Sequence, residues 1–141
     1  MENAKAILKS LKERGQRMTR TREAMVEIFT SAQSPVSAAE VIAALTARKL
    51  GVNKTTVYRE FDFLQAQGVI REIDLLEGQK RYELSEPDHH HHHLVCTKCS
   101  QIQCIDLPKD LDTLERRIAK EHNFKIEHHV LEFFGLCSRC R

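Results

Sequence analysis

Two Cys-x-x-Cys pairs near the C-terminus restrict the fold of this chain more than any other feature. The first pair is Cys96 and Cys99, the second is Cys137 and Cys140, and residues 100–136 (37 residues) separate them. Four thiolates presented on two turns are the ligand set of a closed tetrahedral zinc site. Small domains bury little core, and a bound metal is a common remedy. The spacing therefore predicts a structural zinc site.

A fifth cysteine, Cys104, and a run of five histidines, residues 89–93, lie beside the first pair. In a reducing compartment, Cys-x-x-Cys pairs are more often metal ligands or redox centres than structural disulfides. A redox-active Cys-x-x-Cys pair typically lies beside a βαβ unit, and this sequence has no βαβ pattern. Because four thiolates already fill a structural site, the surplus ligands predict a second metal site.

Composition and hydropathy exclude several protein classes. Hydrophobic residues make up 41% and charged residues 30% of the chain, as in globular rather than disordered or fibrous proteins. No apolar run is long enough to span a bilayer, and residues 1–15 lack the apolar segment of a secretory signal. We therefore expect a cytoplasmic protein with no membrane partner.

Hydrophobic periodicity predicts an N-terminal domain over residues 1–84. Its first 68 residues indicate four helices. These are an apolar stripe over 4–11, a helix from Thr19 or Thr21, a helix opened by the capping box Ser37–Glu40 and ended by Gly51, and a helix from Asn53 to Gly68. Segments 69–73 and 80–84 flank a turn at Glu77-Gly78 and predict a β-hairpin. This element order is that of a winged helix-turn-helix.

The remainder of the chain predicts a smaller α/β domain. Residues 85–88, which are Ser-Glu-Pro-Asp, form the expected hinge. Residues 89–141 predict strands near 93–96, 101–105, 124–127 and 129–134, with one helix that buries Leu111, Leu114 and Ile118. The predicted fold class is α+β, a winged helix-turn-helix domain followed by a small α/β domain with a structural zinc site.

The N-terminal half is basic and contains a helix suited to DNA. The net charge of the chain is +2, yet its first 22 residues hold seven basic and two acidic side chains. On the helix from Asn53 the apolar face is Val57, Phe61 and Leu64, and the outer face with its flanks is Lys54, Thr55, Tyr58, Arg59 and Asp62. Such polar groups near a helix N-terminus fit the major groove, where Arg pairs with guanine. Lys80 and Arg81 of the hairpin are expected to hold the flanking backbone. The alternative is an ordinary amphipathic helix with a solvated face.

The histidine run can supply two different sites. Successive side chains of a strand point to opposite faces. One face joins His91 and His93 to Glu83 and Cys104, a ligand set that suits zinc. The other face offers only nitrogen and oxygen ligands. Such a set accepts iron, manganese or zinc and selects among them less strongly than a set that includes a thiolate. That second set is His90, His92, His129 and an acid from the helix, Asp112 or Glu115.

The order of these motifs resembles the ferric uptake regulator family. The matching segments are Thr55–Arg59, Tyr82–Leu84, the histidine run, Leu94–Cys99 and His129–Cys140. The resemblance covers nearly the whole chain. It implies a homodimeric, metal-dependent transcriptional repressor with an N-terminal winged helix, a C-terminal α/β dimerisation domain (89–141) and a regulatory metal at the hinge between them.

The resemblance also implies roles for individual residues. Tyr58 and Arg59 match the recognition-helix contacts, and Arg17 matches a basic residue that enters the minor groove. The four paired cysteines match structural zinc ligands, whereas Glu83, His91 and His93 match regulatory ligands. The expected contacts with a palindromic double-stranded operator are Arg17, Lys54, Thr55, Thr56, Tyr58 and Arg59.

Two departures from the family pattern bear on the sensed metal. Ser34-Pro35-Val36 stands where many iron-sensing members supply a histidine, and Cys104 stands where they carry a glutamate. A thiolate disfavours ferrous iron and favours four-coordinate zinc. The tail from His129 to Cys137 also resembles zinc uptake regulators more closely. We therefore predict zinc sensing, with iron-sensing (Fe(II) or Mn) and peroxide-sensing members as alternatives.

Proteins of another class with many metal ligands are the remaining alternatives. A zinc hydrolase needs an open coordination position and a general base, and the sequence has no His-Glu-x-x-His motif. A metal-buffering protein has no need of a basic recognition helix. We therefore expect a regulator rather than an enzyme.

Overall fold

The chain folds into two compact units, Met1–Glu86 and Pro87–Arg141. The structure is a computed structural model that describes residues 2–75, 78–85, 92–107, 110–127 and 129–141. The histidines at 89–91 and residues 86–88 of the expected hinge lie outside these ranges, so the boundaries of the hinge stay a prediction. Within the described ranges, no helix combines the length and the apolar character that crossing a bilayer requires.

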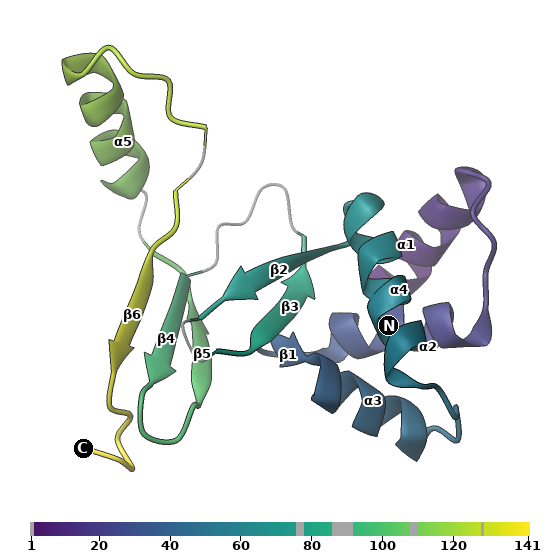
Figure 1. The fold of residues 1–141 in the computed structure, drawn as a ribbon. Helices are drawn as coiled ribbons and strands as arrows, with labels where there is room; N and C mark the ends of the chain where they lie inside the picture. Colours follow the sequence, from purple (N-terminus) through teal and green to yellow (C-terminus); the bar gives the residue numbers. More distant parts are fainter. Residues whose placement is uncertain (1, 76–77, 86–91, 108–109, 128) are drawn as a thin grey trace. The chain divides into compact units, whose positions relative to one another are not determined.

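The N-terminal unit combines helices with a small antiparallel sheet (Figure 1). Its elements are α1 (Glu2–Glu13), α2 (Arg20–Ser31), β1 (Val36–Ser37), α3 (Ala38–Ala47), α4 (Lys54–Ala66), β2 (Ile70–Asp74) and β3 (Lys80–Leu84). The sheet order is β1-β3-β2, and both pairs are antiparallel. The winged helix-turn-helix prediction is confirmed. Strand β1 was not predicted, because two residues are too few to produce an alternating pattern.

Local capping explains where the helices begin and end. Thr19 caps α2, Ser37 and Glu40 form the predicted capping box of α3, and Asn53 caps α4. The prediction that Gly51 ends α3 is wrong. The helix ends at Ala47, and Lys49 adopts the left-handed conformation (φ 59°), which lets the Leu50 N–H bond the Leu45 carbonyl.

Aromatic rings form the centre of the N-terminal core. The Phe61 side chain is fully buried, and its ring centroid lies 4.1 Å from that of Tyr82 and 5.9 Å from that of Phe29. Val57 and Leu64 are also fully buried, so the predicted core face of α4 is confirmed. The ring of Tyr82 on β3 therefore packs the hairpin against α4, which positions the outer face of that helix.

The stability of this unit is expected to fall as the pH rises from about 10 to about 12. Burial of the phenol, followed by the charge of Glu72, raises the pKa of Tyr82 to about 12. An unfolded tyrosine ionises near pH 10, whereas the folded side chain keeps its proton, so ionisation favours the unfolded state in this range. Urea unfolding followed by far-ultraviolet circular dichroism should show this loss in the native chain and a smaller loss in Tyr82→Phe. Parallel pH dependences in the two proteins would contradict the assignment.

The C-terminal unit contains a three-stranded sheet and one helix. Its elements are β4 (His92–Cys96), β5 (Ile102–Ile105), α5 (Asp110–Glu121) and β6 (Glu132–Gly135). The sheet order is β5-β4-β6, with β4 antiparallel to β5 and parallel to β6. The predicted α+β fold class is confirmed.

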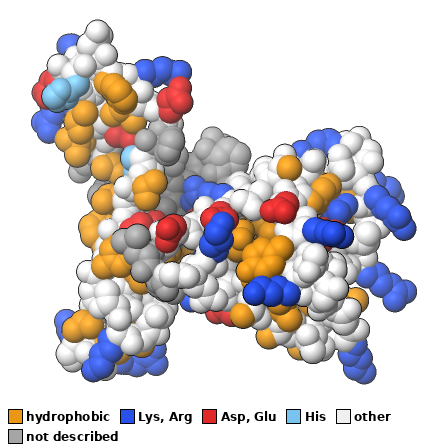
Figure 2. All heavy atoms as spheres, viewed as in Figure 1, with side chains coloured by type: hydrophobic (Ala, Val, Ile, Leu, Met, Phe, Trp, Pro, Cys, Tyr) orange, Lys and Arg blue, Asp and Glu red, His pale blue; other side chains and the backbone are white. Residues whose placement is uncertain are grey.

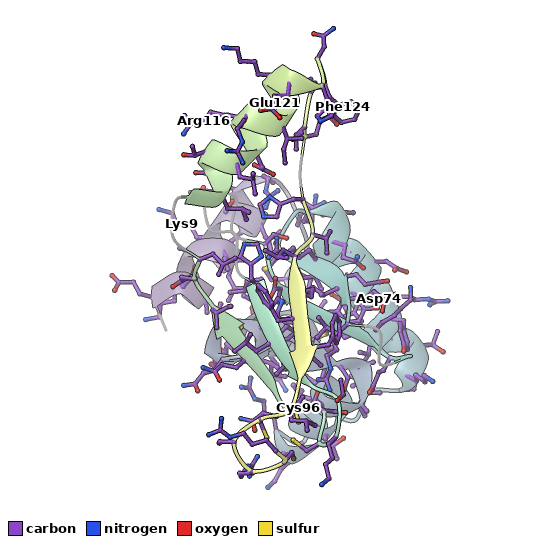
Figure 3. The ribbon with its side chains drawn as sticks, turned by 90° about the vertical axis from the view of Figure 1, so that its left-hand side faces the viewer. Lys9, Asp74, Cys96, Arg116, Glu121 and Phe124 are labelled. Carbon is purple, nitrogen blue, oxygen red and sulfur yellow. The ribbon has the colours of Figure 1, made fainter. Side chains whose placement is uncertain are left out.

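Two expectations for this unit are wrong. Residues 124–127 form no strand, because their alternation makes them amphipathic without giving them a paired neighbour in the described chain. Leu114 and Ile118 of α5 are exposed instead of buried. Figure 3 shows the reason, since α5, with Arg116 and Glu121, stands at the end of the sheet opposite to Cys96. Among the described residues of the C-terminal unit, the sheet does not cover the apolar face of α5.

Candidate metal centres and nucleic-acid interface

The four paired cysteines converge at one end of the C-terminal sheet. Because β4 and β6 run parallel with Cys96 opposite Gly135, the two Cys-x-x-Cys turns follow the same ends of neighbouring strands. The four Sγ atoms lie within 4.8 Å of one another, and Cys99 Sγ is 3.7 Å from Cys137 Sγ. Zinc–sulfur bonds of about 2.3 Å in a tetrahedron place sulfurs about 3.8 Å apart. The donor set and its spacing fit a zinc ion.

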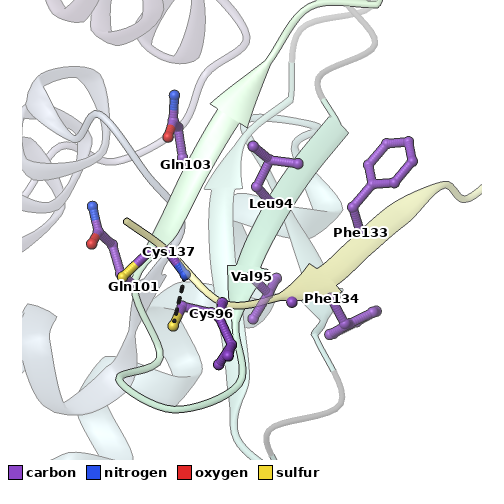
Figure 4. A pocket seen from close by; sticks show the side chains of 10 residues that line it. Leu94, Val95, Cys96, Gln101, Gln103, Phe133, Phe134 and Cys137 are labelled. Atoms are coloured by element: carbon purple, nitrogen blue, oxygen red, sulfur yellow. Dashed lines mark hydrogen bonds between the residues drawn. The ribbon is translucent and has the colours of Figure 1, made fainter. Parts of the chain in front are cut away.

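The environment of these thiols also favours a cation. The backbone N–H of Cys137, 3.4 Å from Cys96 Sγ (Figure 4), and then that of Cys99 lower the pKa of the Cys96 thiol to about 6. The sulfurs of Cys137 and Cys99 raise the pKa of Cys140 to about 12. Neighbouring thiols thus cannot all ionise together without a positive charge among them. All five cysteines are free of disulfide bonds, so their sulfurs can bind a metal as predicted.

His93 and Cys104 form the part of the predicted regulatory site that lies in the C-terminal unit. They are direct partners in the pairing of β4 with β5, and their ligand atoms lie within 4.8 Å of each other. His93 is buried. Glu83 lies on β3 of the N-terminal unit, where its carboxylate accepts from Arg71. His91 lies outside the described residues.

The opposite face of β4 carries a second cluster of nitrogen and oxygen ligands. His129 Nε2 lies 3.5 Å from His92 Nε2, and His129 Nδ1 lies 2.6 Å from Glu115 Oε1. The imidazole rings of His92 and His129 are stacked with their centroids 5.2 Å apart. The structure thus brings together His92, Glu115 and His129, with Glu115 rather than Asp112 as the acid. His90 lies outside the described residues.

Helix α4 presents the predicted polar face to solvent. Lys54, Thr55 and Arg59 are exposed, as is Tyr58, while Thr56 is half-buried. The backbone N–H of Thr56 donates to the side chain of Asn53, the N-cap of α4, at 2.8 Å. Figure 2 shows Lys and Arg side chains spread over the N-terminal unit.

Two arginines of this unit have structural roles that sequence reasoning missed. Arg81 donates to the Pro35 carbonyl and pairs with Glu40 at 3.0 Å, and its expected contact with the DNA backbone stays a prediction. Arg22 is buried, donates to both oxygens of Glu60 at 2.9 and 3.0 Å, and also bonds the Arg17 carbonyl. Arg17 itself is exposed. Its backbone is therefore tied to α4 through Arg22, a link that only the tertiary contacts reveal.

The C-terminal unit exposes apolar side chains over both its helix and its sheet. A pocket of about 200 Å³ lies on the sheet, lined by residues that include Leu94, Phe133 and Phe134 (Figure 4). These three side chains are each between 38% and 43% exposed. Exposed apolar side chains that line a pocket make this face of the sheet a candidate interaction site.

Comparison with known proteins assigns the chain to a family. A model described as "Ferric uptake regulator family" matches residues 13–134. The ferric uptake regulation protein of Synechococcus elongatus is 30% identical over 98% of this chain and 95% of its own length. The peroxide operon regulator of Bacillus subtilis is 29% identical over 96% of this chain and 92% of its own length.

A solved structure supports the fold independently. The ferric uptake regulator of Helicobacter pylori superposes with a TM-score of 0.82 at 22% identity, covering 99% of this chain and 91% of that one. Both sequence relatives are named for ferric uptake or peroxide response, so the expected likeness to zinc uptake regulators gains no support from them. The chain belongs to the ferric uptake regulator family, whose members are transcriptional regulators rather than enzymes.

Proposed function

We propose that this protein is a metal-responsive repressor that binds a palindromic DNA operator as a homodimer. The observation that carries the proposal is the capped helix α4, whose Thr55, Tyr58 and Arg59 face solvent in a chain that also gathers two clusters of metal ligands. Arg59 can pair with guanine in the major groove, and Arg17, tied to α4 through Arg22, contacts the flanking minor groove.

The exposed apolar side chains of the C-terminal unit support homodimerisation. Leu114 and Ile118 on α5 and Leu94 and Phe133 on the sheet are exposed in the single chain. A second copy burying these faces would present two recognition helices. A symmetric operator requires them about 34 Å apart, one turn of the double helix.

The regulatory site in this proposal joins the two units. His93 and Cys104 supply a nitrogen and a sulfur from adjacent strands, and Glu83 on β3 and His91 complete the set. A shared cation would restrict the motion of the winged helix relative to the dimerisation domain and so favour the DNA-competent spacing. By thermodynamic linkage, DNA must then increase metal affinity by the same factor.

We assign zinc as the sensed metal, because a thiolate at position 104 favours zinc over ferrous iron. The relatives named for ferric uptake and for a peroxide operon favour iron or peroxide sensing instead. The cluster of His92, Glu115 and His129 has the nitrogen and oxygen ligands that iron and manganese accept. Iron or peroxide sensing is therefore the second candidate function.

The test is a DNA-binding experiment on the full-length protein with its structural metal retained. A palindrome is selected from a random duplex library with the zinc-loaded protein, and its affinity is then measured with zinc, Mn²⁺, anaerobic Fe²⁺ or no added metal. Tighter binding with zinc than with the other ions supports the assignment. Preference for Fe²⁺ or Mn²⁺, with release by peroxide, supports the second candidate. Equal affinity in all conditions removes the metal switch, and the absence of any salt-sensitive DNA binding would indicate metal buffering.

Replacement of Arg59 by alanine is expected to weaken operator binding by about 1–3 kcal/mol, or roughly 5- to 150-fold, because a bidentate contact with guanine is lost. Fluorescence anisotropy with the selected palindrome measures the change. Lys120→Ala, which removes one exposed positive charge from α5, is the control and should bind nearly as well as the native chain. Equal losses in the two variants would indicate a general charge effect rather than base recognition.

A further inference from the structure

Glu132, the first residue of β6, contacts both the backbone and the side chain of a single histidine on the neighbouring strand. Glu132 and His93 are direct partners in the parallel pairing of β6 with β4. The backbone N–H of His93 donates to Glu132 Oε2 at 3.0 Å, and His93 Nδ1 lies 3.1 Å from each carboxylate oxygen. One side chain thus holds both the backbone and the imidazole of His93.

This contact determines where the imidazole carries its proton. An ionised carboxylate only accepts hydrogen bonds, so the nitrogen facing it must be Nδ1–H. The neutral ring then has its lone pair on Nε2, the nitrogen on the far side of the ring from Glu132. Metals bind the unprotonated nitrogen of a neutral imidazole, and a carboxylate partner on the other nitrogen orients the ring and increases its basicity.

The adjacent histidine is held from the same strand edge. His92 Nδ1 lies 3.0 Å from the carbonyl oxygen of Leu131, the residue before Glu132. A carbonyl accepts only, so His92 is also held as the Nδ1–H tautomer, and its Nε2 faces that of His129. Leu131 and Glu132 therefore orient two consecutive histidines of β4 whose side chains point to opposite faces. Glu132 is the partner that a side-chain substitution can remove.

We propose that Glu132 is a positioning residue of the regulatory site, which holds His93 Nε2 ready to bind metal without itself becoming a ligand. The proposal rests on the regulatory role of His93 in the proposed function. Both carboxylate oxygens of Glu132 are engaged by His93, which favours a supporting role over a ligand role. Sequence reasoning did not select Glu132.

The first measurement concerns the tautomer and needs no regulatory metal. In protein with ¹⁵N-labelled histidine and an intact structural site, long-range ¹⁵N–¹H correlation spectra should show the His93 proton on Nδ1. Glu132→Leu should shift His93 away from this tautomer, whereas Glu132→Gln should largely retain it, because the amide oxygen still accepts. Glu127→Leu replaces an exposed glutamate of the same unit and should leave the spectrum of His93 unchanged.

The second measurement is zinc affinity at the regulatory site, determined by chelator competition. Loss of an outer-shell partner of a metal-ligating histidine typically weakens binding by roughly 10- to 100-fold, and we expect a loss of this size in Glu132→Leu. Glu132→Gln should recover most of the affinity, and Glu127→Leu should equal the native chain. The four-cysteine site should keep one zinc per chain in every variant.

The outcomes separate this inference from the proposed function. Native-like zinc affinity in Glu132→Leu, or an Nε2–H tautomer of His93 in the native chain, overturns the role of Glu132. If Glu132→Leu loses its structural zinc, Glu132→Gln and the native tautomer decide instead. If zinc leaves the DNA affinity of the native chain unchanged, the proposed function fails while the tautomer and affinity results still stand.

Discussion

Replacing Cys96 by serine is expected to release the structural metal and unfold the C-terminal unit. Cys96 ends β4, and its sulfur accepts the Cys137 N–H, so it connects the two turns as well as supplying a ligand. Structural zinc contributes apparent binding free energies of about 10–16 kcal/mol, which is as large as the whole stability of a typical domain, about 5–15 kcal/mol. Elemental analysis should find no zinc at this site, and limited proteolysis should cut within residues 92–141.

The control for this experiment is Cys104→Ser. Cys104 lies outside the four-cysteine cluster, so this variant should keep its structural zinc and its resistance to proteolysis while losing regulatory metal affinity. Both tyrosines, Tyr58 and Tyr82, belong to the N-terminal unit. Their fluorescence should therefore report a preserved unfolding transition in Cys96→Ser. A Cys96→Ser protein that resists proteolysis and retains one tightly bound zinc would contradict the structural role.

Replacing Phe61 by alanine is expected to destabilise the N-terminal unit by about 3–5 kcal/mol, because a fully buried aromatic side chain leaves a cavity. The Phe61 ring lies within 6 Å, centroid to centroid, of three other rings: Phe29 at 5.9 Å, Tyr58 at 5.8 Å and Tyr82 at 4.1 Å. The loss would consume much of a typical domain's stability. DNA binding should weaken in parallel, because Tyr58 and Arg59 lie on the same helix.

Urea unfolding followed by tyrosine fluorescence measures this change. Phe124→Ala is the matched control, since the same substitution removes a ring that is 66% exposed and belongs to the C-terminal unit. It should leave the tyrosine transition in place. A Phe61→Ala transition within 1 M urea of the native midpoint would disagree with the expected cost, since small domains lose about 1–3 kcal/mol per molar urea.

The N-terminal elements could be predicted because their signals are local. A helix cap involves residues three positions apart, so Ser37 with Glu40 and Asn53 with Thr56 are visible in the sequence. The apolar face of α4 is likewise set by helical periodicity. The end of α3 was missed, because a left-handed Lys49 took the place that glycine usually occupies.

The C-terminal unit was predicted less well because its order depends on contacts between distant residues. The alternation at 124–127 describes an amphipathic segment, and only strand pairing decides whether such a segment becomes part of a sheet. Leu114 and Ile118 similarly indicate an apolar helix face that requires a packing partner. The periodicity does not specify whether that partner belongs to the same chain or to a second copy.

By itself, the sequence determined the ligand chemistry, because thiolates, imidazoles and carboxylates are identified by residue type and the Cys-x-x-Cys spacing already joins two ligands on one turn. Only the tertiary structure decided how distant ligands and their supports meet. The parallel register of β4 and β6 brings the two cysteine turns together and sets Glu132 against His93. The position of α5 brings Glu115 to His129. In the N-terminal unit, the fold likewise brings Arg22 of α2 to Glu60 of α4, 38 positions away in the sequence. Residues so far apart carry no shared periodicity, so their pairing becomes visible only when the chain has folded.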